Sequence, residues 1–131
     1  MANVRALQEA LQKEVEEFKK VQEDINKNHA ARQKFLEQKN ENDMVKKELG
    51  LLEDGACVFR LVGPVLIKQE QDEAKSNVDK RLGFINGELE RLEKAFKAFE
   101  KKQAEKENAI RAIQQKLQKQ QQQAQATTAQ A

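Results

Sequence analysis

The chain has 131 residues, of which 35% are charged and 5% are aromatic, and its formal net charge is +2. This length allows one domain, and the nearly balanced charge gives no electrostatic reason to expect nucleic acid or an anionic membrane as a partner. The single cysteine, Cys57, excludes an internal disulfide and is typical of a reducing compartment. The N-terminus has no signal-peptide core, and no apolar stretch approaches the ~20 residues of a membrane span, so we expect a cytoplasmic protein.

The first half of the chain has apolar residues in alternating steps of three and four, which predicts one long helix over about residues 3–53. Such a heptad pattern is typical of a coiled coil. The residues at these heptad positions, called the seam, are mostly apolar as far as Ile25 and polar after it. We therefore expect weaker packing in the second part of this helix.

A short, dense apolar segment, "VFRLVGPVLIKQE" at residues 58–70, predicts a β-hairpin over about residues 57–69. Gly63-Pro64 suits a two-residue type II′ turn, because Gly63 supplies positive φ at the first central position. A longer loop stays open as an alternative. Apolar side chains fall on both faces of this hairpin. One face holds Val58, Val62, Val65 and Ile67 together with Arg60, and the other holds Phe59, Leu61 and Leu66.

The two apolar faces predict that the hairpin is completed by other chains. Leaving its seven large apolar side chains in water would forgo on the order of 10–20 kcal/mol, more than the stability of a typical small domain. A lone two-stranded hairpin is marginal and has open edges, and the rest of the chain predicts no strands. We therefore expect an obligate oligomer. The expected oligomerisation residues are Val58, Phe59, Leu61, Val62, Gly63, Pro64, Val65, Leu66 and Ile67.

The second half of the chain has a cleaner heptad pattern and predicts a helix over about residues 71–119. Ten of its twelve seam positions are apolar, and the exceptions are Gln103 and Lys106. The two seams have similar lengths and are separated by a short segment, so the chain is expected to fold back on itself. Folding back places Phe18 near Lys106, and Leu7 near Leu117.

Together these elements predict a mainly α fold, a long antiparallel two-helix coiled coil with one β-hairpin at the bend. Residues 1–117 are expected to form a single domain. Residues 118–131 are low in complexity and rich in Gln, and we expect them to be disordered.

This arrangement resembles a beta-class prefoldin subunit. The likeness rests on "LLEDGACVF" and "GPVLIKQEQDEAKSNVDKRL", is most specific over residues 49–92, and extends to about Leu117. It implies a heterohexamer of two alpha-class and four beta-class subunits, whose hairpins join into a β-barrel body that carries coiled-coil tentacles. It further implies ATP-independent binding of unfolded or nascent polypeptides, of the actin and tubulin type, and their transfer to the cytosolic group II chaperonin.

The apolar seam residues at the outer helix ends are the candidate client-binding tip. The alternative is that they form only the core of the coiled coil. The two polar seam residues, Gln103 and Lys106, would let the helix ends separate while the rest of the coiled coil stays paired. The tip residues are Val4, Leu7, Leu11, Ile110, Ile113 and Leu117.

No motif in the chain indicates a catalytic, cofactor-binding or metal-binding site, so we expect neither enzyme activity nor a cofactor. The expected partners are other alpha- and beta-class prefoldin subunits, unfolded clients and the group II chaperonin, with no nucleic acid and no membrane. Two other classes of protein stay open. A coiled-coil scaffold or spacer gives no reason for a doubly apolar hairpin. An RNA-binding helical-hairpin arm calls for a one-sided basic stripe, whereas Lys and Glu are interspersed here.

Overall fold

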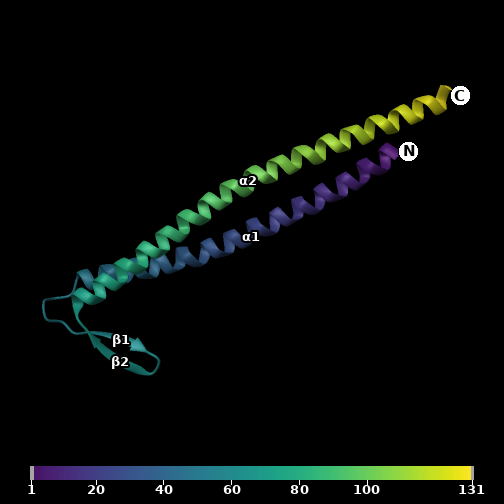
Figure 1. The fold of residues 1–131 in the computed structure, drawn as a ribbon. Coiled ribbons are helices and arrows are strands. Elements are labelled where there is room, and N and C mark those ends of the chain that lie inside the picture. The colour runs from purple at the N-terminus through teal and green to yellow at the C-terminus, as the bar shows by residue number, and fades with distance from the viewer. Residues whose placement is uncertain (1, 131) are drawn as a thin grey trace. The chain divides into compact units, whose positions relative to one another are not determined.

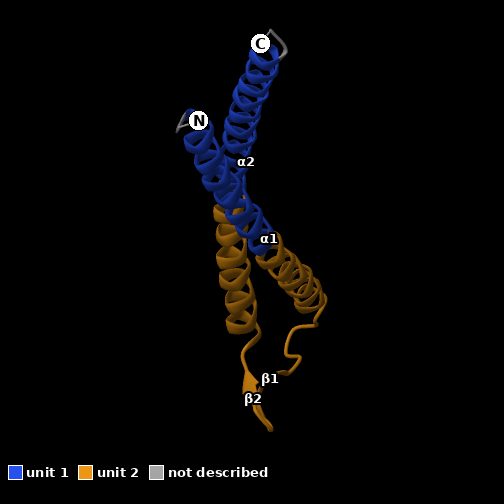
Figure 2. Ribbon diagram, turned by 90° about the vertical axis from the view of Figure 1, so that its right-hand side faces the viewer, with its two compact units in different colours: residues 1–28, 95–131 blue, residues 29–94 orange. Residues whose placement is uncertain are grey.

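A computed structural model describes residues 2–130 of the chain. Two long helices are packed together with an antiparallel β-hairpin between them (Figure 1), which confirms the predicted mainly α fold class. The chain divides into two units, residues 29–94 and the remainder at both chain ends, which are described separately (Figure 2). The elements are α1 (Ala2–Gly50), β1 (Val58–Val62), β2 (Val65–Gln69) and α2 (Gln71–Gln130).

Helix α1 ends at Gly50, three residues before the end expected from the sequence. The amide of Leu51 donates to the Glu48 carbonyl at 3.1 Å, and the amide of Leu52 donates to the Leu49 carbonyl at 3.4 Å. These bonds span three residues instead of four, so the last turn tightens and the α-helical ladder stops. The first heptad pattern itself has its last apolar seam residue at Leu49, so the predicted bound at residue 53 reached into the turn that follows Gly50.

The loop between α1 and β1 is fastened to the first residue of α2. The side-chain amide of Gln71 donates to the Glu53 carbonyl at 2.8 Å and to the Ala56 carbonyl at 3.0 Å. Within the loop, the Ala56 amide donates to the Glu53 carbonyl at 3.1 Å, and Gly55 adopts a φ of 85°. The Gln71 side chain therefore gives the Ala56 carbonyl a protein donor and adds a second donor to the Glu53 carbonyl.

Strands β1 and β2 pair antiparallel with Val62 opposite Val65, so the turn contains only Gly63 and Pro64. Gly63 has a φ of 58°, while the proline ring holds the φ of Pro64 negative. A type I′ turn needs positive φ at both positions, so this combination fits the predicted type II′ turn. Arg60 lies opposite Ile67, and the two predicted faces of the hairpin follow directly from this register.

The core of the hairpin-bearing unit lies where the end of α1 meets the start of α2. Val58, the first hairpin residue, packs against this core and anchors the base of the hairpin to the helices. The buried core residues are Leu49, Ala74, Val78 and Leu82.

Removing one of these core side chains should measurably weaken the fold. Leu82 is 7% exposed, so Leu82→Ala is expected to lower the free energy of unfolding by about 2–4 kcal/mol, through lost burial and the cavity left behind. The control is Leu51→Ala, because Leu51 is 84% exposed and its truncation should change stability by less than about 0.5 kcal/mol. Urea unfolding followed by circular dichroism measures both, and equal effects would contradict this assignment of the core.

In the other unit, the first part of α1 lies beside the second part of α2 (Figures 1 and 2). Val21 is its most completely buried side chain. Leu7 and Lys116 line the same groove, and Lys106 contacts Glu17, the residue before Phe18. The antiparallel pairing expected from the two heptad patterns is therefore confirmed within this unit.

Helix α2 continues to Gln130, which differs from the disordered tail predicted for residues 118–131. Gln, Lys and Ala are good helix formers, and residues 118–130 contain neither Gly nor Pro, so no residue stops the helix once it has formed. The hydroxyls of Thr127 and Thr128 also donate to the Gln123 and Ala124 carbonyls at 2.8 Å. Residue 131 lies outside the described residues.

Candidate functional site

The hairpin presents the largest group of exposed apolar side chains near one point of the chain. Six of its large apolar residues are between 48% and 69% exposed: Phe59, Leu61, Val62, Val65, Leu66 and Ile67. Val58 is half-buried against the helical core, while Gly63 and Pro64 are exposed at the turn. The structure thus brings all nine predicted oligomerisation residues into one hairpin and leaves most of them in solvent.

Both faces and both outer edges of this hairpin are available for contact. The described residues form only one sheet, with β1 and β2 as its two strands, so each strand keeps one edge without a strand partner. Unpaired strand edges are templates for strands of another chain, and apolar faces are buried when such strands or helices cover them. This geometry can perform assembly, and it holds no group that would perform chemistry.

The six candidate tip residues all lie in the unit that contains both chain ends, and each is half-buried. A groove of about 440 Å³ lies between the helices there, lined by Leu7 and Ala6 from α1 and by Lys116, Gln120 and Gln123 among others from α2. Half-burial is expected of seam residues in a coiled coil. These side chains would therefore become more exposed if the two helix ends separated.

A half-buried ion-pair cluster lies next to the tip residues. Lys106 Nζ lies 3.0 Å from Glu14 Oε2 and also donates a hydrogen bond to Glu17 Oε2, and the three side chains are only 20–38% exposed. The hydrogen bond from Lys106 lowers the pKa of Glu17 below its ordinary 4.5. Hydrogen bonds to Glu17 and then to Glu14 raise the pKa of Lys106 above 10.5.

The sequence analysis identified Lys106 as a polar residue in the apolar seam, but it did not predict its two carboxylate partners, Glu14 and Glu17. The available signal was Glu14, which occupies a seam position of the first heptad pattern and carries the opposite charge. To predict that Glu14 pairs with Lys106, one must know which residues of the two helices lie side by side. The heptad patterns predicted this register only to within about one helical turn.

This cluster should make the stability of the chain fall in acid. The folded pKa of Glu17 is lowered, so its stabilising contribution is present above pH 4.5 and is lost as the pH falls through the folded pKa. Glu17→Gln is expected to show a smaller decrease in melting temperature between pH 7 and about pH 3.5 than the unchanged chain. Glu16→Gln, at the neighbouring exposed position, is the control and should keep the full decrease.

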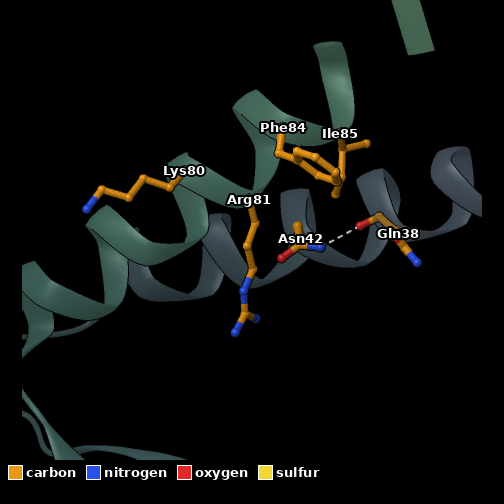
Figure 3. A pocket seen from close by; sticks show the side chains of 6 residues that line it. All are labelled: Gln38, Asn42, Lys80, Arg81, Phe84 and Ile85. Carbon is orange, nitrogen blue, oxygen red and sulfur yellow. Dashed lines mark hydrogen bonds between the residues drawn. The ribbon is translucent and has the colours of Figure 1, made fainter. Parts of the chain in front are cut away.

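A second groove lies beside an exposed aromatic side chain in the hairpin-bearing unit (Figure 3). Phe84 is 64% exposed, and its ring centroid lies 6.4 Å from that of Phe35 in an edge-on arrangement. Asn42 Nδ2 donates to the Gln38 carbonyl at 2.7 Å on the facing helix. The groove is lined by Gln38, Asn42, Lys80, Arg81, Phe84 and Ile85, and it contains no nucleophile and no set of metal ligands.

The described residues include no group of three His, Cys, Asp or Glu side chains arranged to hold a metal ion. Cys57 is exposed and is not in a disulfide. Within the same part of the chain, neither helix has a stretch long and apolar enough to cross a membrane.

Comparison with known proteins finds a family described as "Prefoldin subunit", whose profile matches residues 12–131. The chain is 48% identical over 92 residues to prefoldin subunit 6 of Arabidopsis thaliana, which covers 70% of this chain and 71% of that protein. It is 47% identical over 87 residues to prefoldin subunit 6 of Homo sapiens, covering 66% and 67%. For prefoldin subunit 6 of Saccharomyces cerevisiae the identity is 43% over 94 residues, covering 72% and 74%.

Solved structures agree on the fold. The crystal structure of the prefoldin beta subunit from Thermococcus strain KS-1 superposes with a TM-score of 0.70 and covers 82% of this chain and 91% of that chain. The sequence identity is 21%, so this likeness concerns the fold alone. The expected resemblance to a prefoldin subunit is confirmed, and the three relatives named above are each a prefoldin subunit 6. The chain belongs to the prefoldin subunit family.

Proposed function

We propose that the chain is a beta-class subunit that assembles into the prefoldin chaperone complex through its hairpin. Family membership already implies a role in that complex, with other prefoldin subunits as partners, and a chaperone subunit without enzyme activity. The observation that supports the hairpin as the point of assembly is its exposure: six large apolar side chains on two faces of a two-stranded sheet with open edges.

In the proposed assembly, the hairpin joins the hairpins of two alpha-class and three further beta-class subunits in a β-barrel body. Strand addition would pair the free edges of β1 and β2, and the closed sheet would bury one apolar face as its interior. Burial of each large apolar side chain is worth roughly 1.5–3 kcal/mol, so the hairpin alone could supply much of the association energy.

The proposed activity is ATP-independent holding of unfolded or nascent polypeptides at the tip, followed by their transfer to the cytosolic group II chaperonin. The apolar, half-buried side chains near both chain ends support this proposal, because separating two helix ends would expose them together. The proposed clients are of the actin and tubulin type, and the proposed location is the cytoplasm.

The native mass and composition of the complex purified from its source test this proposal. We expect this chain to co-purify with five other small coiled-coil chains, all prefoldin subunits, in one assembly. The assembly should suppress aggregation of a denatured client without added ATP. A chain isolated as a homodimer, free of other prefoldin subunits, would contradict the proposal and favour the coiled-coil spacer, which predicts no suppression of aggregation.

A further inference from the structure

One charged side chain stands in the middle of a hairpin face whose other residues are apolar except for Gln69 at the base. Arg60 lies directly opposite Ile67, and Val58 and Val62 are its neighbours on the same strand and the same face. Any partner that covers Val62 and Ile67 must therefore also approach Arg60. The side chain is exposed in the free chain, where water solvates the guanidinium.

The chain itself supplies no partner for this charge. Within the described residues, Arg60 makes no ion pair and no side-chain hydrogen bond. A guanidinium is always ionised, and moving an unpaired ion out of water costs several kcal/mol even in a real protein interior. Assembly through this face therefore needs a compensating group from outside the chain, and a carboxylate matches the planar fork of a guanidinium with two parallel hydrogen bonds.

The other cation of the hairpin stands in a different environment. Lys68 lies on the opposite face, near the base, and lines a polar hollow of about 300 Å³ together with Asp54, Glu70 and Asp72. Like Arg60, Lys68 makes no ion pair among the described residues, but it shares a hollow with three carboxylates of its own chain, whereas the nearest residues on the face of Arg60 are mostly apolar. Lys68 does not require a charge from a neighbour, and it offers a matched control within the same hairpin.

We infer that Arg60 pairs with an Asp or Glu carboxylate of a neighbouring prefoldin subunit when the hairpin is covered, and so selects which subunit can occupy that face. The inference rests on the proposed function, because it requires assembly through the hairpin. The occupant is a hairpin or helix face that is apolar around one acidic residue. An all-apolar or basic surface is rejected, because it would leave the guanidinium desolvated without a counter-ion.

Competition between variants for the partner subunits tests this pairing. Unlabelled variants compete with the wild-type chain, labelled at its C-terminus, for the partner subunits that co-purify with it. Arg60→Met keeps an apolar side chain of similar length and removes the charge. The partner's carboxylate is then buried without a counter-ion, so incorporation is expected to weaken by about 100-fold. Arg60→Glu should weaken incorporation at least as much, and Arg60→Lys, which keeps the charge but loses the fork, about tenfold. Lys68→Met should compete within about twofold of the wild type.

The outcomes separate this inference from the proposed function. If Arg60→Met competes as well as the wild type, the guanidinium stays in solvent at the rim and the pairing is refuted. A second variant, Leu66→Asp on the other face, reports on assembly through the hairpin itself. If Leu66→Asp still assembles, the proposed function fails and the pairing fails with it. If Leu66→Asp is excluded while Arg60→Met is not, only the pairing fails.

Discussion

Leu66→Asp is expected to keep the chain out of the prefoldin complex while leaving its helices intact. Leu66 is 64% exposed in the free chain, so a carboxylate at this position should change the stability of the isolated chain by no more than about 0.5 kcal/mol. In the assembled hairpin the same carboxylate would be buried opposite Leu61, while Lys68 on the same face lies nearer the base, in a hollow that it shares with Asp54, Glu70 and Asp72. Burying the carboxylate costs several kcal/mol, so we expect incorporation to fall by at least about 100-fold.

Co-expression with the partner subunits, followed by size-exclusion chromatography, measures this exclusion, and far-UV circular dichroism checks the helices. Met44→Asp is the matched control, because Met44 is 63% exposed but lies on α1 outside the hairpin. This control should co-elute with the complex. Leu66 lies on the face without Arg60, so the result does not depend on the pairing inferred for that arginine. Co-elution of Leu66→Asp with its partners would refute assembly through the hairpin.

Removing the tip residues is expected to reduce client holding without preventing assembly. Deleting residues 1–11 and 110–131 takes away all six candidate tip side chains and leaves the hairpin and its helical core in place. If a client replaces part of their half-buried contacts, the six side chains together contribute about 1.4–2.8 kcal/mol, so the affinity of clients bound through this subunit should fall by about 10- to 100-fold. Suppression of aggregation of a denatured client by the assembled complex measures the loss.

The control for this deletion ends the chain after Leu117. It removes residues 118–131, whose described side chains include no large apolar residue, and it keeps the six tip residues. We expect this control to hold clients like the full chain. If the complete tip deletion assembles and holds clients normally, the six residues are only the core of the coiled coil.

Much of the fold follows from local sequence features. The hairpin was predictable because β-branched residues surround Gly63-Pro64, and because only a type II′ turn suits that dipeptide at a two-residue length. The helix ends were less predictable. The first helix was expected to end near residue 53, but the amides of Leu51 and Leu52 bond only three residues back and the helix ends at Gly50. Residues 118–130 combine low complexity with good helix formers, and composition indicated disorder where the structure has a helix.

The candidate sites divide in the same way. The hairpin and the exposure of its apolar side chains were predictable, because such side chains on both faces of a short hairpin find no other strand among the described residues to cover them. The role of these residues in oligomerisation stays a prediction. The ion-pair cluster of Lys106 with Glu14 and Glu17 was not predictable, because it joins residues about 90 positions apart and depends on the register between two helices. That Arg60 lies opposite Ile67 follows from the strand register. That it has no ion-pair partner among the described residues could be seen only in the structure.

By itself, the sequence determined the two helices, the hairpin between them and the need for partners, because side-chain periodicity and turn chemistry act over a few neighbouring residues. Only the tertiary structure decided which half-buried charges meet and where each helix stops. Those features depend on contacts between distant residues and on backbone hydrogen bonds, and heptad and alternation patterns do not specify either of them.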